Sequence, residues 1–224
     1  MSEDNPIKVI LLGEDGVGKT SLFRMVLESE FNPEYFPSYS AEKCDRAICV
    51  DNKDYLFYLW DTPGQEKFRS LNRIFINRSH VILIVFEINE RESFNQIDYW
   101  YNVVKEILGN DGYIIALIGN KSDLYEQQEI SNEEIEKKAK ELKTKFIIMS
   151  AKNNYGDFKM FFDDLLKDYI NKYHPEESKK CLTPTTKRIK LEKERKKKKK
   201  EFFRKICTGQ RFVNTQIYIT FILL

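Results

Sequence analysis

The chain has 224 residues, 42% of them hydrophobic and 32% charged, and its 9 glycines and 6 prolines exclude a collagen-like or low-complexity protein. This length suits one well-buried domain with an extension rather than a second core. The 4 cysteines form neither a C-x-x-C metal pair nor a disulfide framework, and residues 1–6 lack the basic and apolar regions of a secretory signal. We therefore expect a cytoplasmic protein without a zinc site.

The formal net charge of +2 conceals two parts of opposite sign. Residues 1–175 hold 22 Lys and Arg against 30 Asp and Glu, a net charge of −8, whereas residues 176–224 hold 15 against 5, a net charge of +10. An acidic body with a basic tail predicts that the tail meets an anionic surface, either a membrane or a nucleic acid. We expect a folded domain at residues 1–175, a polybasic tail at 176–205 and a short apolar extension at 206–224.

Short apolar runs alternate with helical periodicities along the folded part. Most runs are continuous, as in strands that are buried on both faces. The predicted elements in chain order are a strand at Lys8–Leu12, a helix at Thr20–Glu28, a more polar edge strand at Ala41–Val50, strands at Tyr55–Trp60 and Val81–Ile88, a helix at Ser93–Leu108, a strand at Tyr113–Ile118, a helix at Ser131–Leu142, a strand at Phe146–Met149 and a helix at Phe158–Tyr173. This order predicts an α/β fold in which helices cover a mainly parallel sheet. Ser131 and Glu134 form a capping box that fixes one helix start.

The segment from Gly13 to Thr20 follows the first strand, matches G-x-x-x-x-G-K-T and leads into a helix. Glycines in such a loop let backbone N–H groups point at phosphate oxygens. Lys19 supplies a positive charge, and the Thr20 hydroxyl can ligate Mg²⁺. The segment therefore predicts a phosphate-binding loop.

Three further motifs follow predicted strands: Asp61-Thr62-Pro63-Gly64-Gln65, Asn120-Lys121-Ser122-Asp123 and Ser150-Ala151-Lys152. Because the carboxyl ends of parallel strands open onto one crevice, we expect these motifs to meet the phosphate loop. Asp61 occupies the place of an acid that holds a Mg²⁺-bound water. The Asp123 carboxylate matches the N1–H and 2-amino donors of guanine rather than the edge of adenine. Either of the last two motifs alone would be weak evidence, and N-K-S-D alone is more often an ordinary loop.

The four motifs, in this order and at strand ends, resemble the small GTPases of the Ras superfamily over residues 7 to about 173. The resemblance implies the P-loop GTPase fold, with a mostly parallel six-stranded sheet and about five helices, and a GTP/GDP switch that uses Mg²⁺. It implies Gln65 and Lys19 as catalytic residues and Thr20, Ser38 and, through water, Asp61 as the metal site. The implied nucleotide-binding residues are Gly13, Asp15, Gly16, Val17, Gly18, Lys19, Thr20, Ser21, Phe31, Tyr35, Ser38, Gly64, Asn120, Lys121, Asp123, Ser150, Ala151 and Lys152.

Three of these positions belong to the first switch of the family. Counted from Lys19, Phe31 falls where the family places an aromatic ring against the guanine edge, and Ser38 falls where it places a Mg²⁺-binding threonine. Tyr35 matches the tyrosine that closes over the γ-phosphate. By this resemblance, we expect exchange factors, activating proteins and effectors to read the two switches, roughly residues 32–42 and 61–72, of a monomer.

The subfamily signals differ along the chain. The segments Gln65–Leu71 and Ala139–Leu142 look like Rab proteins, whereas Glu34–Ser38 looks like Rho. Rho proteins carry an extra helix between the last two motifs, and the interval from Asp123 to Ser150 is too short for it. The resemblance thus favours a Rab-like switch in vesicle and membrane traffic. The alternatives are a Rho-like signalling GTPase and an interaction module that does not cycle or stays locked with GTP.

Two departures from the family pattern concern hydrolysis. Asp15 stands where Ras has glycine and many Rab proteins have serine, and Pro63 replaces the family's alanine. A carboxylate near the γ-phosphate would obstruct Gln65 and an arginine finger, and proline fixes φ and removes an N–H just before Gly64. We therefore predict slow hydrolysis. The alternative is that Asp15 points to solvent and matters little.

The polybasic tail lacks the family's prenylation signal. A C-a-a-X box needs cysteine fourth from the end, and that position is Phe221, while Cys207 lies well upstream. The last 13 residues would form a helix of only about 20 Å, too short for a hydrocarbon core of about 30 Å. Either they form an interfacial anchor helped by the basic run, or the mature chain lacks them. We expect peripheral association with an anionic membrane rather than nucleic-acid binding, because stacking aromatics are few.

Overall fold

The computed structural model describes residues 6–27, 40–50, 53–65, 69–153 and 155–174 of the chain. The chain divides into two compact units, Met1–Cys181 and Leu182–Leu224, and every described residue lies in the first. The predictions made for Phe31, Tyr35 and Ser38, and those for the tail and its apolar extension, lie outside the described residues.

The folded unit is built on one six-stranded sheet with the order β2-β3-β1-β4-β5-β6. Its strands are β1 (Ile7–Leu12), β2 (Glu42–Val50), β3 (Lys53–Asp61), β4 (Val81–Glu87), β5 (Ile114–Asn120) and β6 (Lys145–Ile148). β2 at the edge runs antiparallel to β3, and every other neighbouring pair is parallel. The predicted α/β class, the mostly parallel sheet and the polar edge strand are therefore confirmed.

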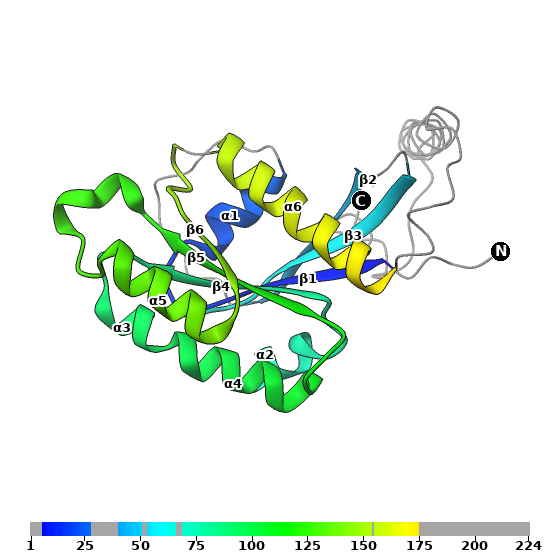
Figure 1. Cartoon of the computed structure of the whole chain (residues 1–224), viewed down its shortest axis with the longest axis horizontal. Coiled ribbons are helices and arrows are strands. Elements are labelled where there is room, and N and C mark those ends of the chain that lie inside the picture. The colour runs from blue at the N-terminus through cyan, green and yellow to red at the C-terminus, as the bar shows by residue number, and fades with distance from the viewer. Residues whose placement is uncertain (1–5, 28–39, 51–52, 66–68, 154, 175–224) are drawn as a thin grey trace, which may run out of the picture. The chain divides into compact units, whose positions relative to one another are not determined.

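The helices lie on both sides of this sheet (Figure 1). They are α1 (Lys19–Val26), α2 (Arg69–Ile76), α3 (Arg91–Asn95), α4 (Ile97–Leu108), α5 (Asn132–Leu142) and α6 (Tyr155–Tyr173), with a 3₁₀ helix at Ser122–Gln127. α1 and α6 cover one face, and α2 to α5 cover the other, as their buried side chains show. Within the described residues, no helix is both long and apolar enough to cross a membrane.

Two hydrophobic cores result, one on each side of the sheet, and they explain the continuous apolar runs. Val9 and Leu11 of β1 point into the core beneath α1 and α6, whereas Ile10 and Leu12 point into the core against α4. Fully burying one such side chain contributes about 1.5–3 kcal/mol, so a strand with two apolar faces is held strongly in the centre of the sheet. The central strands therefore give the loops at their ends a rigid support.

Two helical predictions differ from the structure. The single helix predicted at Ser93–Leu108 is two helices, α3 and α4, joined at Gln96. Ser93 lies inside α3, where its hydroxyl accepts a hydrogen bond from Glu87 N at 3.0 Å and donates one to Glu90 O at 2.9 Å. α2 is not predicted from the sequence, because its apolar side chains are not confined to a buried face: Ile74 is 69% exposed.

The capping box at the start of α5 is confirmed. Glu134 N donates to Ser131 Oγ at 3.2 Å, and Ser131 N donates to Glu134 Oε2 at 3.0 Å. Arg91 of α3 also donates to Glu134, with 2.6 Å between Nη1 and Oε1. These contacts hold the pKa of Glu134 down at about 2, the hydrogen bond from Arg91 being the largest cause. Together they tie α3 to the start of α5.

Candidate functional site

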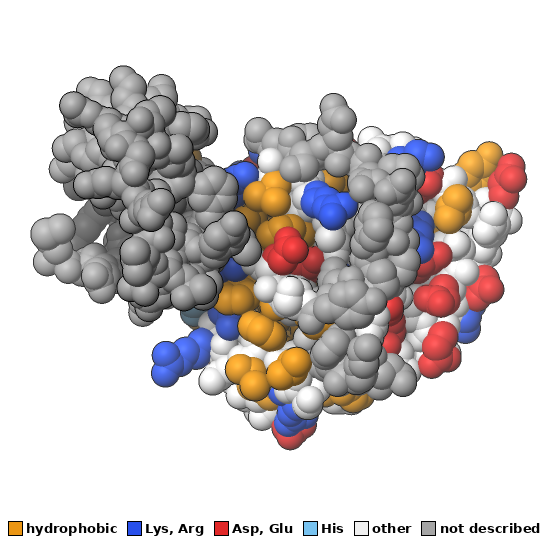
Figure 2. All heavy atoms as spheres, turned by 180° about the vertical axis from the view of Figure 1, so that it is seen from behind, with side chains coloured by type: hydrophobic (Ala, Val, Ile, Leu, Met, Phe, Trp, Pro, Cys, Tyr) orange, Lys and Arg blue, Asp and Glu red, His pale blue; other side chains and the backbone are white. Residues whose placement is uncertain are grey.

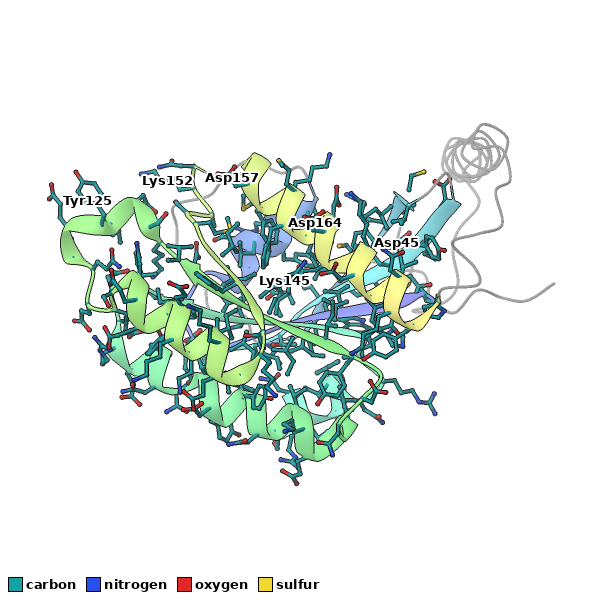
Figure 3. The ribbon with its side chains drawn as sticks, in the orientation of Figure 1. Asp45, Tyr125, Lys145, Lys152, Asp157 and Asp164 are labelled. Atoms are coloured by element: carbon teal, nitrogen blue, oxygen red, sulfur yellow. The ribbon has the colours of Figure 1, made fainter. Side chains whose placement is uncertain are left out.

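The four sequence motifs meet at the carboxyl edge of the parallel strands. The loop Gly13–Gly18 follows β1, Asp61 ends β3, Asn120 ends β5, and Ser150 follows β6. Figure 3 shows Lys152 of the last motif at the same end of the sheet as Tyr125 of the 3₁₀ helix. The topology thus places these motifs around one crevice, as expected for ligand sites in open α/β sheets.

Two glycines of the first loop allow close backbone approach. Gly13 has a φ of 142°, and a Cβ atom there would lie 2.1 Å from the carbonyl oxygen of Val85 in β4. Gly18 has a φ of 98°, and a Cβ atom there would lie 2.1 Å from Nδ2 of Asn120. Since neither position tolerates a side chain, the loop is fitted tightly against β4 and β5 while its N–H groups remain near the start of α1.

Lys19 provides a buried positive charge inside this loop. Its side chain is 5% exposed, and Nζ donates to Gly13 O at 2.9 Å and to Glu14 O at 2.6 Å. Burial lowers the pKa of Lys19 to about 8, and the charges of Asp61, Asp15 and Glu14 oppose this shift. An anionic phosphate would give this ammonium a stronger partner than two neutral carbonyl groups do.

Thr20 and Asp61 form a pair of oxygen donors next to the loop. The Thr20 hydroxyl donates to Asp61 Oδ2 at 2.7 Å, and Asp61 is 1% exposed. Burial raises the pKa of Asp61 to about 6, while the bond from Thr20 and the charge of Lys19 oppose the rise. Asp61 Oδ1 is buried without a hydrogen-bond partner among the described residues. A buried, unpaired carboxylate oxygen beside a hydroxyl suits a hard cation such as Mg²⁺.

Asn120 joins two of the loops through its side-chain amide. Its Nδ2 donates to Val17 O at 2.8 Å, and its Oδ1 accepts from Ala151 N at 2.9 Å. The residue is 2% exposed, so both bonds are shielded from water. In this arrangement Asn120 fixes the relative position of the phosphate loop and the Ser150-Ala151-Lys152 loop.

Asp123 and Lys121 are each held by a neighbour from another element. Ser150 Oγ donates to Asp123 Oδ1 at 2.5 Å, and Lys152 N donates to Ser150 Oγ at 3.1 Å. Lys121 has a φ of 65° and forms an ion pair with Glu87 at the end of β4. These contacts orient a carboxylate and a lysine stem at the place where the sequence predicts a guanine base.

The start of the second switch packs directly against the phosphate loop. The Thr62 hydroxyl donates to Leu11 O at 2.6 Å, and Asn72 Nδ2 of α2 donates to Pro63 O at 2.9 Å. A Cβ atom on Gly64 would lie 2.5 Å from Glu14 O and 2.6 Å from Asp15 Cα. The two segments are therefore in backbone contact.

Gln65 is half-buried beside this contact, and the side chain of Asp15 is exposed. The exposure of Asp15 agrees with the alternative that its side chain points to solvent and matters little for hydrolysis. Its charge nevertheless acts on the interior of the site, because it is one of the groups that raise the pKa of Lys19.

Several residues that shape the site are not predicted from the sequence. Asn72 holds Pro63, and Trp100 of α4 donates from Nε1 to Glu14 Oε1 at 3.0 Å. Neither residue belongs to a recognisable motif, and Trp100 is distant in sequence from its partner. The predicted residues of the four motifs do come together, while Phe31, Tyr35 and Ser38 lie outside the described residues.

Comparisons with known proteins agree with this geometry. A model of the Ras family matches residues 8–171 of the chain. The chain is similar to the Ras-related protein RabC of Dictyostelium discoideum, with 35% identity over 172 residues that cover 75% of this chain and 86% of RabC. The family match contains all four loops described above.

Proposed function

Because the chain belongs to the Ras family and is a Rab-like small GTPase, we propose that it acts as a GTP/GDP switch in membrane traffic and hydrolyses GTP slowly. Members of this family bind guanine nucleotides and hydrolyse GTP, and the chain is a GTP hydrolase of this kind. The Rho-like alternative has less support, because residues 122–150 hold only the 3₁₀ helix, α5 and β6.

The arrangement of the loops suggests how each residue contributes to hydrolysis. Lys19 would exchange its loop carbonyls for phosphate oxygens, and N–H groups of the loop would surround the phosphates. Thr20 and Ser38, with Asp61 acting through a water, would hold Mg²⁺, which neutralises charge on the phosphates when it is bound. Gln65 would orient a water that attacks the γ-phosphorus in line, breaking its bond to the β-phosphate oxygen and leaving GDP and phosphate.

The contact between Gly64 and Asp15 is the observation that supports slow turnover. It brings the second switch within backbone contact of the residue that carries the additional carboxylate. A negative charge at this position repels the triphosphate, and its bulk occupies space that an arginine finger needs. Since an arginine finger contributes about 10³ to 10⁵ in rate, hindered access has a larger effect than a small intrinsic defect.

Single-turnover hydrolysis by the wild type and two variants tests this proposal. Asp15→Ser removes charge and bulk, and Asp15→Asn removes the charge alone. We expect Asp15→Ser to hydrolyse GTP faster than wild type, and Asp15→Asn shows how much of the gain comes from charge. Equal rates for the wild type and both variants would reject slow turnover through Asp15. The assignment to the small GTPases would be unaffected.

The surface next to the second switch supports binding of regulators and effectors. Leu71 and Ile74 of α2 are 45% and 69% exposed, and Leu56 of β3 is 41% exposed. Figure 2, which views the molecule from behind Figure 1, shows exposed hydrophobic side chains among charged and polar ones. Large apolar side chains left in water beside a nucleotide-dependent segment suit a partner that reads that segment. Leu71→Ser should weaken effector binding without changing nucleotide affinity.

The polybasic tail supports a place on a cytoplasmic membrane surface. Each basic residue close to anionic lipid contributes up to about 1 kcal/mol, and Lys196 to Lys200 form an unbroken run. Co-sedimentation of the full chain with phosphatidylserine vesicles should therefore fall when these five lysines become glutamine. Binding to phosphatidylserine that survives these substitutions would reject the tail as the electrostatic anchor. Tighter binding of the tail to nucleic acid than to these vesicles would favour nucleic-acid binding as its role.

A non-cycling interaction module is the second candidate, and the features that oppose hydrolysis favour it. By the family pattern Asp15 and Pro63 would flank the γ-phosphate, and Pro63 is buried. Nucleotide content of the purified chain separates the candidates: a cycling switch converts loaded GTP to GDP over hours, whereas a locked module retains GTP.

A further inference from the structure

A hydrogen bond links the phosphate loop to the core between α4 and the sheet. The indole Nε1 of Trp100 donates to Glu14 Oε1 at 3.0 Å, across 86 positions of sequence. Trp100 is 1% exposed and belongs to the core that includes Phe86 and Phe94, so its ring is held by packing. A buried indole N–H needs an acceptor, and a carboxylate is the strongest acceptor that a side chain can offer.

The other end of this link is the part of the loop where three groups meet. The carbonyl oxygen of Glu14 accepts the hydrogen bond of Lys19 Nζ at 2.6 Å. The same oxygen would lie 2.5 Å from a Cβ atom on Gly64, which shows how closely the second switch approaches. Fixing the Glu14 side chain therefore restrains the peptide that contacts both the phosphate-binding lysine and the switch.

The hydrogen bond from Trp100 also determines which way the Glu14 carboxylate points. Glu14 is a negative charge within a loop that must bind phosphates, and it already raises the pKa of Lys19. A charged hydrogen bond toward α4 keeps this carboxylate on the core side of the loop. Without that bond, the carboxylate could turn toward the phosphates or compete for Lys19.

We propose that Trp100 is a positioning residue for the phosphate loop: its indole N–H holds Glu14, and through Glu14 it sets the backbone against which Lys19 and Gly64 are placed. Trp100 itself touches no phosphate in this scheme. Its loss acts through Glu14 and weakens retention of the nucleotide. The proposal uses the family's nucleotide binding but does not depend on slow turnover or on a role in membrane traffic.

A double-mutant cycle measures this coupling. Trp100→Phe keeps an aromatic ring and removes the N–H, Glu14→Ala removes the acceptor, and the third variant combines both. The measurement is the release rate of fluorescently labelled GDP in Mg²⁺ buffer. We expect either single variant to release GDP about tenfold faster than wild type, since a charged hydrogen bond is lost. In the double variant, the second change should add nearly nothing.

Two further variants separate positioning from general packing. Glu14→Gln keeps an oxygen acceptor for the indole, so its release rate should stay closer to wild type than that of Glu14→Ala. Trp60→Phe is the matched control, because Trp60 Nε1 is buried without a hydrogen-bond partner among the described residues. It makes the same chemical change and should leave GDP release within about twofold of wild type.

The outcomes decide the proposal in either direction. Additive effects of Trp100→Phe and Glu14→Ala, or wild-type release by Trp100→Phe, would overturn it, because a purely structural tryptophan would act independently of Glu14. If Trp100→Phe fails to fold, the comparison of Glu14→Ala with Glu14→Gln still decides. Equal release rates of these two variants would reject the role of the acceptor, and faster release by Glu14→Ala alone would support it.

Discussion

Asn120 donates a hydrogen bond from its buried side-chain amide to the carbonyl oxygen of Val17 at 2.8 Å, although 103 positions separate the two residues. The other side of the same amide accepts a hydrogen bond from Ala151 N. A residue at the end of β5 thus connects the loop after β1 with the loop after β6. These two hydrogen bonds fix the position of the phosphate loop relative to the loop of the predicted base site.

Asn120→Ala should destabilise the domain even without nucleotide. The substitution leaves a buried carbonyl group of Val17 and a buried N–H group of Ala151 without their partners, which costs about 2 kcal/mol or more. Urea unfolding in the presence of a chelator measures the change. Asn153→Ala, at an exposed position of the neighbouring turn, is the control and should unfold like wild type. Equal midpoints for the two variants would contradict this role of Asn120.

Ser150→Ala should weaken GDP binding by about tenfold, because it removes the hydroxyl that orients Asp123 at 2.5 Å. The hydrolysis rate of the bound GTP should change little, since the substitution lies at the base and not at the γ-phosphate. Ser150→Thr retains a hydroxyl and is the control. Calorimetric titration with GDP measures the affinity, and an unchanged value for Ser150→Ala would show that Asp123 is oriented by other contacts.

The sequence predicts the strands well for a physical reason. β1, β4 and β5 are buried on both faces, so they appear as continuous apolar runs whose ends differ by at most two residues from the prediction. The edge strand β2 is recognisable by its polarity. α2 is different, because it packs through Ile76 and Asn72 while Leu71 and Ile74 face outward. Its apolar residues therefore do not mark the buried face.

Some residues of the candidate site are predictable from the sequence and others are not. Glycine spacing predicts the phosphate loop, since local backbone geometry requires those glycines. The partners that hold the loop in place come from distant segments and follow no local rule. In the sequence, Trp100 is indistinguishable from an ordinary core residue and Asn72 from an ordinary surface residue. Only the fold shows that Trp100 contacts Glu14 and that Asn72 contacts Pro63. Tertiary contacts of this kind are not encoded in spacing.

Asn72→Ala should slow GTP hydrolysis while leaving GDP affinity near that of wild type. The bond from Asn72 Nδ2 to Pro63 O fixes the segment that leads to Gly64 and Gln65, and these residues act only at the γ-phosphate. We expect a rate reduction of about tenfold, since a small misplacement of the water-orienting group is costly. Asn77→Ala, at the exposed position after α2, should keep the wild-type rate. A parallel loss of GDP affinity in Asn72→Ala would indicate general unfolding instead.

The stability of the domain should fall as the pH drops below about 6.5 because of His80. Its Nδ1 accepts a hydrogen bond from Lys8 N at 2.8 Å, and its ring lies 5.3 Å from that of Tyr169. Burial lowers the pKa of His80 below the usual 6.5, and the neighbouring His174 and Lys8 act in the same direction. Below pH 6.5 the unfolded chain therefore binds a proton that the folded domain does not, so stability is retained above this pH and lost beneath it.

His80→Asn tests this pH dependence, because asparagine offers an oxygen acceptor to Lys8 N and does not titrate. Thermal unfolding at pH 7.5 and pH 5.5 should show a smaller loss of melting temperature for this variant than for wild type. The comparison uses the difference between the two pH values, so any constant cost of the substitution cancels. If both proteins lost the same number of degrees, the carboxylates of the domain rather than His80 would account for its acid sensitivity.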